Sequence, residues 1–585
     1  MEVTRTNFQN VLAELDDVLQ KATFLAIDGE FTGLNSGPDA NAYDTPAQYY
    51  TKLRSGSMDF LLVQFGLATF TYNSETNKYS QRAYNFYVFP RPFDRSSPDC
   101  RFKCQASSIA FLANQGFDFN KLFKQGIPYL TKDEEDKLNK KMEEKQKLRD
   151  EGLDLIPISD DDKPQIEEIC ARIDNFIESV EEELVLDRCN AFIRRLIYQE
   201  VRQRWPDKIR LETKTDTGSM PHIIAYKLGN KEDEEQKEAD RREKEKLDVQ
   251  EAVGLSALLR KIADSGKLIV GHNMLLDLCH IVHQFFGPLP QCYLEFKSLV
   301  HCLFPRLLDT KIICQSSIFN TSVPSVLDYL IDHLQAPPFS IPEMENVENR
   351  SYKISKDKLH EAGYDAYITG LCFIALSNRL GAIHTPSESV VLADSPLLKP
   401  YLNKLLIARL KDIPFINLAG RDPNPNRDHV FHITFPKEWK YSDLTQLFSP
   451  YGGAYVAWLS DTTAYAGLYQ KEQISAVIKD LFKSTKYNLQ RYKEHQASLQ
   501  NEKPIKQERK RKISEVDEPT SEKPMAEPEE KDDSSTSPKG EDDGWEVATG
   551  KRRRKRHRTQ SALDQEPAPK KADNRKKFAE NDTWA

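Results

Sequence analysis

The sequence predicts an α/β fold with a mixed sheet and flanking helices, and three observations support this prediction. Apolar runs at residues 23–31, 60–70 and 83–90 follow one another at short spacing, which is typical of neighbouring strands of one sheet. From Leu255 onward, short apolar runs alternate with segments of helical periodicity, which favours a sheet covered by helices. After about residue 412 a second series of short elements begins, and its order predicts a small βαββα domain.

Composition and charge narrow the class of protein. The chain has 585 residues, a net charge of −8 and 29% charged residues, so we expect several domains and extensive solvated segments. The N-terminus lacks the basic and apolar regions of a secretory signal, and no stretch approaches the roughly 18 apolar residues that span a bilayer. The nine cysteines include no CxxC pair, which favours a reducing, intracellular compartment. We therefore expect no membrane association and no zinc finger.

Two highly charged segments, residues 131–152 and 229–248, interrupt the larger domain. The residues between them show apolar side chains at helical spacing, which predicts a compact inserted module. Beyond about residue 487 the apolar content collapses, which predicts disorder. The expected organisation is a first part of the larger domain at 1–160, the module at 163–232, a charged linker and second part at 233–390, the small α+β domain at 413–486 and a disordered tail at 487–585.

Three acidic residues stand out at strand and helix ends. Asp28 and Glu30 are two residues apart on a predicted strand, so their carboxylates share one face and repel each other without a positive partner. Hard oxygen ligands of this kind suit Mg²⁺ or Mn²⁺. Asp277 is predicted to share a helical face with Asn273, four residues earlier. Alone, the first pattern is better explained by an exposed strand end, and the second is explained equally well by a helix-start hydrogen-bond network.

A fourth acid, Asp365, lies at the start of the last helix predicted for the larger domain. His360 lies five residues before it, and Gly363 between them suggests a flexible turn into the helix. A histidine above a fixed carboxylate can accept a proton near neutral pH, which suits a general base. Alone, His360 is better explained as an ordinary surface histidine.

Together, the D-x-E strand, the N-x₃-D helix and the H-x₄-D helix start resemble the DEDD exonuclease superfamily, in its histidine-containing branch with an RNase H-like fold. The resemblance implies that four carboxylates hold two Mg²⁺ ions, with Mn²⁺ as a substitute, and that His360 is the general base. Two ions about 4 Å apart can clamp a scissile phosphate, and a nucleoside 5′-monophosphate would leave the 3′ end. The implied metal ligands are Asp28, Glu30, Asp277 and Asp365.

Longer segments resemble the poly(A)-specific ribonuclease family over about residues 1–485. They include FLAIDGEFTGL, IVGHNMLLDLCHIVHQFFGPLP and HEAGYDAYITG. This resemblance implies a homodimeric deadenylase that acts on single-stranded RNA with a 3′ poly(A) tail and releases 5′-AMP. The preference for adenine rests on the resemblance alone. The implied substrate contacts are Phe31, Ile109, Phe111, Asn273 and Lys311.

The inserted module resembles the R-three-H domain, a small α/β unit that binds single strands. Arg194 takes the position of its arginine, and Tyr198 replaces its histidine and could stack a base. Several arginines give this helix a basic side, although a solvated helix face explains them equally well. They are Arg188, Arg194, Arg195, Arg202 and Arg204.

The later domain resembles an RRM that lacks the usual basic start and second aromatic of its central strand. Its strands still offer Phe431, His432 and Tyr465. The resemblance implies that Trp458 stacks on the methylated guanine of an mRNA 5′ cap, whose positive charge suits an indole face. The alternative is that Trp458 packs in the domain core.

The tail carries basic clusters at residues 505–513 and 550–558, which favour nuclear import or unspecific RNA contacts. We expect the protein in the nucleus and the cytoplasm, with the nucleolus as a further location. Two alternative functions remain open at this point. One is a related DEDD exonuclease that trims the 3′ ends of small non-coding RNAs, and the other is a catalytically inactive RNA-binding protein. The complete set of four acids and His360 argues against the second.

Overall fold

The computed structural model describes residues 1–501 except 94–98, 152–155, 207, 215–220, 229–230, 320–322, 346, 348 and 385–389. Both basic clusters of the tail lie outside the described residues.

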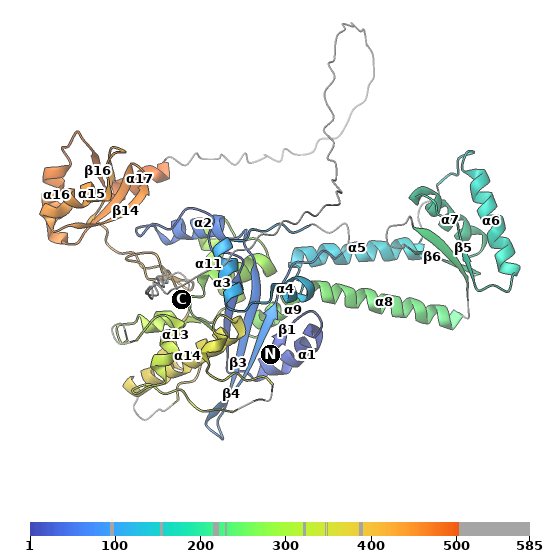
Figure 1. The fold of residues 1–585 in the computed structure, drawn as a ribbon, viewed down its shortest axis with the longest axis horizontal. Coiled ribbons are helices and arrows are strands. Elements are labelled where there is room, and N and C mark those ends of the chain that lie inside the picture. Colours follow the sequence, from blue (N-terminus) through green and yellow to red (C-terminus); the bar gives the residue numbers. More distant parts are fainter. Residues whose placement is uncertain are drawn as a thin grey trace, which may run out of the picture. The chain divides into compact units, whose positions relative to one another are not determined.

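A seven-stranded mixed sheet forms the centre of the larger domain, as predicted (Figure 1). Strand β3 pairs antiparallel with β2 and β4, whereas β1, β8, β9 and β10 pair parallel with their neighbours. The sheet therefore combines a meander of three long strands with two short parallel strands beside β2. In spatial order the strands are β1 (Glu2–Val3), β4 (Lys78–Tyr87), β3 (Leu62–Asn73), β2 (Phe24–Phe31), β8 (Leu268–Gly271) and β9 (Leu307–Asp309), and β10 (Met344–Glu345) also pairs with β4.

Alternate residues of β2 enter two separate cores, because successive strand side chains point to opposite faces of a sheet. Leu25 and Ile27 pack with α1 (Phe8–Lys21), α9 (Leu255–Asp264) and α10 (Leu275–Ile281). Phe24 and Ala26 pack instead with α14 (Ala362–His384), which lies across β2, β3 and β4. The remaining helices of this domain are α2 (Pro46–Ser57), α3 (Ala106–Asn114), α4 (Phe119–Gln125), α11 (Tyr293–Leu303), α12 (Thr310–Cys314) and α13 (Leu327–Leu334), with a π-helical turn at Val282–Phe286.

Helix α14 is long and apolar enough to cross a membrane, contrary to the expectation that no segment approaches this length. However, 78% of its apolar window is buried against the sheet and its neighbours. Its apolar character is explained by burial on nearly all sides in a protein core.

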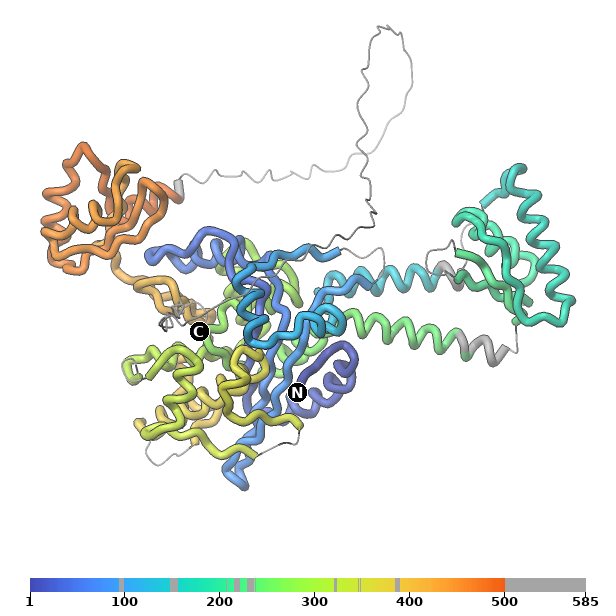
Figure 2. Tube along the Cα trace, viewed as in Figure 1, coloured from blue at the N-terminus to red at the C-terminus, as the bar shows by residue number. Residues whose placement is uncertain are grey.

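The inserted module has its own core of two helices and a three-stranded sheet in the order β5-β7-β6. Ile156 and Ile158 also pack against this core, so the packed unit begins before the predicted boundary at residue 163. The charged segments around it form α5 (Lys132–Glu151) and α8 (Lys231–Val253), which contact each other (Figure 2). The module consists of α6 (Lys163–Glu178), β5 (Glu183–Val185), α7 (Ala191–Arg204), β6 (Ile209–Lys214) and β7 (His222–Lys227).

The small domain is a four-stranded antiparallel sheet in the order β14-β15-β13-β16 with α15 and α16 packed on it. The prediction missed β16 and placed it in the disordered tail, because this strand is short and buries only Leu489. The larger domain likewise extends beyond residue 390, since Leu405 and Ile416 of the β11–β12 hairpin lie in its core. The elements are β11 (Lys404–Leu406), β12 (Phe415–Asn417), β13 (Val430–Thr434), α15 (Tyr441–Phe448), β14 (Ala454–Ser460), β15 (Thr463–Leu468), α16 (Ile474–Leu481), β16 (Asn488–Arg491) and α17 (Tyr492–Asn501).

Gly66 of β3 allows α14 to lie unusually close to the sheet. A methyl group at Gly66 would lie 1.9 Å from the Ala362 carbonyl oxygen, so Gly66→Ala should force the helix start outward. We expect a loss of about 1–3 kcal/mol in the free energy of unfolding, the usual cost of overpacking, measured by denaturant titration. Gly420→Ala is the matched control, because its methyl would meet only the flexible Asn417 side chain. Equal losses in both variants would contradict the close packing.

Candidate active site

Strand β2 carries the first two predicted acids near its C-terminal end. Asp28 lies opposite Gly66 and Glu30 lies opposite Gln64 in the antiparallel pairing with β3. Both side chains project toward the face covered by α14, since even-numbered β2 residues enter that core. The pairing register shifts after Glu30, so the strand becomes irregular where the acids end.

Asp277 reaches the same strand from α10, which packs on the opposite face. A methyl group at Gly29 would lie 3.0 Å from Asp277 Oδ1, so glycine leaves room for this carboxylate against the strand. The expectation that Asn273 shares a helical face with Asp277 is wrong. Asn273 precedes the helix and has a left-handed backbone with φ of 62°. Its N–H donates to Asp309 Oδ1 at 2.9 Å, which stabilises this uncommon conformation.

Asp365 lies in the first turn of α14, and the residue that turns the chain before it is His360. His360 has a left-handed backbone with φ of 65°, and its N–H donates to Asp365 Oδ2 at 3.0 Å. The expectation of a turn at Gly363 is therefore wrong. Gly363 belongs to the helix, and a methyl group there would lie 2.8 Å from the Tyr84 carbonyl oxygen.

Burial is the largest cause that raises the pKa of all four carboxyls, and nearby negative charge adds to it. The pKa of Asp28 lies well above its ordinary value because of burial first, and then because of Asp365, Asp277 and Glu30. Burial, Asp365 and Asp277 raise the pKa of Glu30 in the same way. Burial raises the pKa of Asp277 to about 7 and that of Asp365 to about 8. Asp277 and Asp365 both act on Asp28 and on Glu30, so negative charge is unfavourable at this end of β2.

The donor set suits a hard divalent cation. Single ligand atoms of Glu30, His360 and Asp365 lie within 4.8 Å of one another. Within the described part of the chain, Asp365 Oδ1 is buried and has no hydrogen-bond partner. A buried carboxylate oxygen without a partner is costly, and coordination to a cation would satisfy it.

The structure places two of the predicted substrate contacts beside these acids or His360, two on neighbouring elements, and one in a buried position. Phe31 follows the acids on β2, and Phe111 on α3 lies edge-on to the His360 ring at 4.7 Å. Ile109 lies on the same helix, and Asn273 lines a cavity of about 130 Å³. Lys311 is only 4% exposed, so it does not form the open phosphate contact that the sequence suggested.

Two functional candidates were missed in the sequence. Asp309 is fully buried and accepts the backbone N–H groups of Asn273 and Lys311 on one oxygen and that of Leu406 on the other. It therefore fixes the backbone of both predicted substrate contacts, and its place at the end of a short strand was the available signal. His280 lies beneath the Phe31 ring at 4.7 Å, and burial lowers its pKa to about 3, so this imidazole is neutral.

Comparison with known proteins assigns the fold around these acids. The family model described as CAF1 family ribonuclease matches residues 3–373. The chain belongs to the CAF1 ribonuclease family. A second model, described as RNA binding domain, matches residues 420–498 and so includes β16, which the sequence prediction had excluded.

Curated relatives resemble this CAF1-family ribonuclease over most of its length. Poly(A)-specific ribonuclease PARN of Homo sapiens is 43% identical over 86% of this chain and 82% of its own length. The protein of the same name from Xenopus laevis is 42% identical over 85% of this chain and 81% of its own length. The pre-piRNA 3′-exonuclease trimmer of Bombyx mori is 26% identical over 85% of this chain and 94% of its own length.

Some of the residues predicted to bind RNA in the inserted module form contacts with other residues of the module instead. The Arg194 guanidinium donates to the Cys189 and Pro221 carbonyl oxygens, and Arg204 forms ion pairs with Glu167 and Glu200. Tyr198 is 38% exposed, although its hydroxyl lies 3.2 Å from Thr213 Oγ1. Its ring is therefore accessible, whereas these two arginines serve local structure.

The raised carboxyl pKa values predict how pH and metal affect the stability of this ribonuclease. With pKa values of about 7 for Asp277 and about 8 for Asp365, the metal-free fold keeps protons that the unfolded chain releases near pH 4. The protonated carboxyls of Asp277 and Asp365 stabilise the fold fully below about pH 4, and this stabilisation is lost as the pH rises through about 7–8. The melting temperature of the metal-free protein should therefore fall between about pH 6 and pH 9.

Metal ions bind carboxylates in the deprotonated form, so if this site holds Mg²⁺, the ion should raise the melting temperature more at about pH 9 than at pH 6. Asp365→Asn should weaken the pH dependence of the melting temperature and the pH dependence of the Mg²⁺ effect. Asp17→Asn, at an exposed position on α1, should change neither. Equal stabilisation by Mg²⁺ at both pH values would contradict the assignment.

Proposed function

We propose that this CAF1-family ribonuclease is a deadenylase, a 3′→5′ exoribonuclease that shortens poly(A) and releases 5′-AMP. The observation that carries the proposal is that β2, α10 and α14 bring four carboxylates together, of which Glu30 and Asp365 are buried and Asp28 and Asp277 are half-buried. The poly(A)-specific ribonucleases of Homo sapiens and Xenopus laevis, which are 43% and 42% identical to this chain, support the poly(A) substrate. The complete set of acids disfavours an inactive RNA-binding protein. The lower identity to the trimmer disfavours trimming of small RNAs as the main activity.

Asp28, Glu30, Asp277 and Asp365 would hold two Mg²⁺ ions, or Mn²⁺ in their place. Bound there, the ions would acidify the attacking water and stabilise the charge on the scissile phosphate and the leaving 3′ oxygen. The residues of the chain supply the geometry: β2 presents two carboxylates on one face, α10 presents the third past Gly29, and α14 presents the fourth.

His360 would act as the general base that takes the proton of the attacking water. Its backbone N–H is fixed to Asp365 at 3.0 Å, so the imidazole is anchored next to the carboxylate cluster. Its ring also lies against Phe111, which restricts the orientations that it can adopt. In this proposal the backbone of His360 stabilises one acid while its side chain moves a proton.

The substrate would be single-stranded RNA with a 3′ poly(A) tail. Phe31, Ile109 and Phe111 offer apolar surfaces on which terminal bases can pack. Asn273 would contact the same nucleotides from the left-handed turn that precedes α10, and Lys311 would act on the phosphates electrostatically from its buried position. A homodimer is part of the proposal, as is residence in the nucleus, the cytoplasm and the nucleolus.

Trp458 would bind the 5′ cap of the RNA. Its side chain is 39% exposed at the end of β14, and the edge-on contact with Phe435 at 5.1 Å leaves indole surface open to solvent. An accessible indole can stack on a positively charged methylated guanine. This exposure favours a ligand contact over core packing.

Degradation of homopolymers tests the proposed activity. In Mg²⁺, the full chain should degrade poly(A) faster than poly(C), poly(G) or poly(U), with 5′-AMP as the product. Asp28→Asn keeps the side-chain shape and removes the charge, so poly(A) turnover should fall at least about 10³-fold, equivalent to several kcal/mol. The control Asp17→Asn should keep its rate. Near-normal turnover by Asp28→Asn would exclude the metal-ligand role, and equal rates on all four polymers would exclude adenine preference.

Cap-analogue titration tests the role of Trp458. Trp458→Ala should weaken binding of a methylated cap analogue by about 1–3 kcal/mol, the range of base–aromatic stacking, and leave uncapped poly(A) hydrolysis unchanged. Trp439→Phe is the control, because Trp439 is a partly buried tryptophan that packs against the core of the same domain. A core role for Trp458 would instead lower the domain's melting temperature and leave cap affinity intact, which would contradict the proposal.

A further inference from the structure

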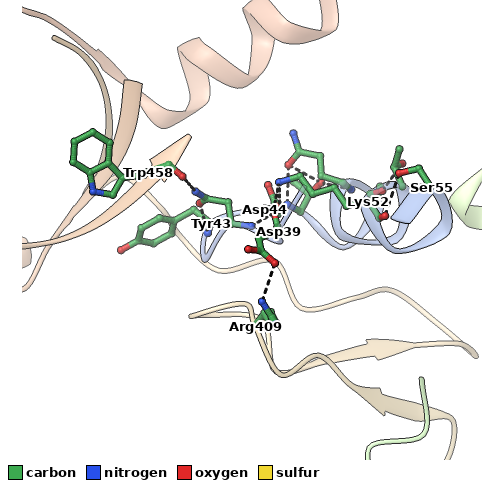
Figure 3. A network of polar contacts seen from close by, with 12 residues as sticks. Asp39, Tyr43, Asp44, Lys52, Ser55, Arg409 and Trp458 are labelled. Atoms are coloured by element: carbon green, nitrogen blue, oxygen red, sulfur yellow. Dashed lines mark hydrogen bonds and ion pairs between the residues drawn. The ribbon is translucent and has the colours of Figure 1, made fainter. Parts of the chain in front are cut away.

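A loop of the larger domain, residues 41–44, is held in one shape by its own polar contacts. Asp44 Oδ2 accepts the Asn41 N–H at 2.7 Å, and Asn41 Oδ1 accepts the Tyr43 N–H at 3.0 Å. Lys52 on α2 forms an ion pair with Asp44 at 2.8 Å (Figure 3). The loop therefore presents Tyr43 in a preorganised conformation, which lowers the entropy lost when its ring is buried.

Tyr43 is buried against one face of the sheet of the RNA-binding domain, the face opposite to α15 and α16. Its ring lies edge-on to Tyr455 and to Tyr465, with centroids 6.1 Å apart in both pairs. Only 2% of its surface is exposed, and Val430 lies in the same apolar cluster. Gly467 provides the space, because a methyl group there would lie 1.9 Å from the Tyr43 hydroxyl oxygen.

Arg427, near the start of the RNA-binding domain, stabilises the contact between this domain and the loop at residues 41–44. Its guanidinium forms two hydrogen bonds, of 2.6 and 2.8 Å, to the Asp412 carboxylate. It also donates to the Tyr43 and Asp44 carbonyl oxygens and to the Tyr492 hydroxyl. Only 5% of this side chain is exposed, so removal of one partner would leave a buried charge unpaired.

The rest of the sheet face is covered from within the domain. His432 and Tyr465 are paired neighbours on the two central strands, where single-stranded RNA stacks in ordinary domains of this kind. The His495 ring of α17 stacks on His432 at 3.6 Å, and His495 Nδ1 lies 2.8 Å from the Tyr465 hydroxyl. Both positions are nearly inaccessible, with exposures of 7% and 2%.

We propose that the sheet face of the RNA-binding domain is a docking surface for the loop at residues 41–44 of the same chain, and that it does not bind RNA. The shape of the loop, the glycine opposite Tyr43 and the buried Arg427 are all explained by this role. The inference does not depend on the deadenylase proposal, because it concerns a contact outside the carboxylate site.

This assignment separates Trp458 from the covered face. The Trp458 carbonyl oxygen accepts the Asn41 side-chain amide at 2.8 Å, while its indole remains 39% exposed (Figure 3). The loop therefore holds the backbone of β14 without covering the ring. RNA would reach this domain at the strand that carries Trp458 and not on the sheet face.

A double-mutant cycle tests the contact in the full chain. Gly467→Ala should push Tyr43 away and raise amide hydrogen exchange in residues 463–468 at least about tenfold by local opening. Tyr43→Ala should open the same strand by loss of packing. In the double variant the added methyl meets no ring, so exchange should equal that of Tyr43→Ala alone. If the two effects multiply, the residues do not touch and the proposal is overturned.

Two further measurements complete the test. Tyr441→Ala, an exposed tyrosine on α15 of the same domain, should leave exchange in residues 463–468 unchanged. Single-stranded oligo(A), added in EDTA to prevent hydrolysis, should leave exchange unchanged in residues 41–44, 430–434 and 463–468. Protection of the two strands together with faster exchange in residues 41–44 would show that RNA displaces the loop, which would overturn the proposal.

Discussion

The structure of the larger domain depends on one constraint, which is that four carboxylates must stay together at one end of β2 although burial and nearby negative charge disfavour their ionised forms. Burial alone disfavours each charged form, and three neighbours add to the effect on Asp28. Such a cluster is maintained only if rigid elements prevent the acids from separating. Strand β2 lies between β3 and β8, α14 is covered on nearly all sides, and α10 begins in the opposite core. The two cores thus provide the rigidity that this unfavourable site requires.

The start of α14 shows how this rigidity is achieved at atomic scale. The first N–H groups of a helix have no partner within the helix and need one elsewhere. Here the Gln64 side chain accepts the Ala362 N–H at 3.0 Å, and the Asn85 side chain accepts the Gly363 N–H at 3.2 Å. Both side chains come from the central strands, and Gly66 between them lets the helix backbone touch the sheet. The helix is therefore capped by the sheet itself, which fixes Asp365 relative to Asp28.

Local patterns revealed the acids, whereas their surroundings depend on contacts between distant segments. Asp28 and Glu30 could be identified because a strand places alternate residues on one face, and that rule needs no tertiary information. Asn273 and His360 were also identified, but their backbone conformations could not be predicted, because both are left-handed and are stabilised by Asp309 or by Asp365. Strand β16 was missed for a similar reason, since its pairing with β13 gives order to a polar segment.

The unusual sequence of the RNA-binding domain also has a physical explanation in the covered sheet face. A face that stacks bases needs flat aromatic rings open to solvent, whereas a face that packs against protein needs complementary shape and satisfied polar groups. Tyr465 has a partner for its hydroxyl in His495, and Gly467 has no side chain where Tyr43 approaches. The missing aromatic and basic positions are therefore consistent with a protein interface. The positions that depart from an ordinary RNA-binding sheet face are therefore the ones that the contact with residues 41–44 requires.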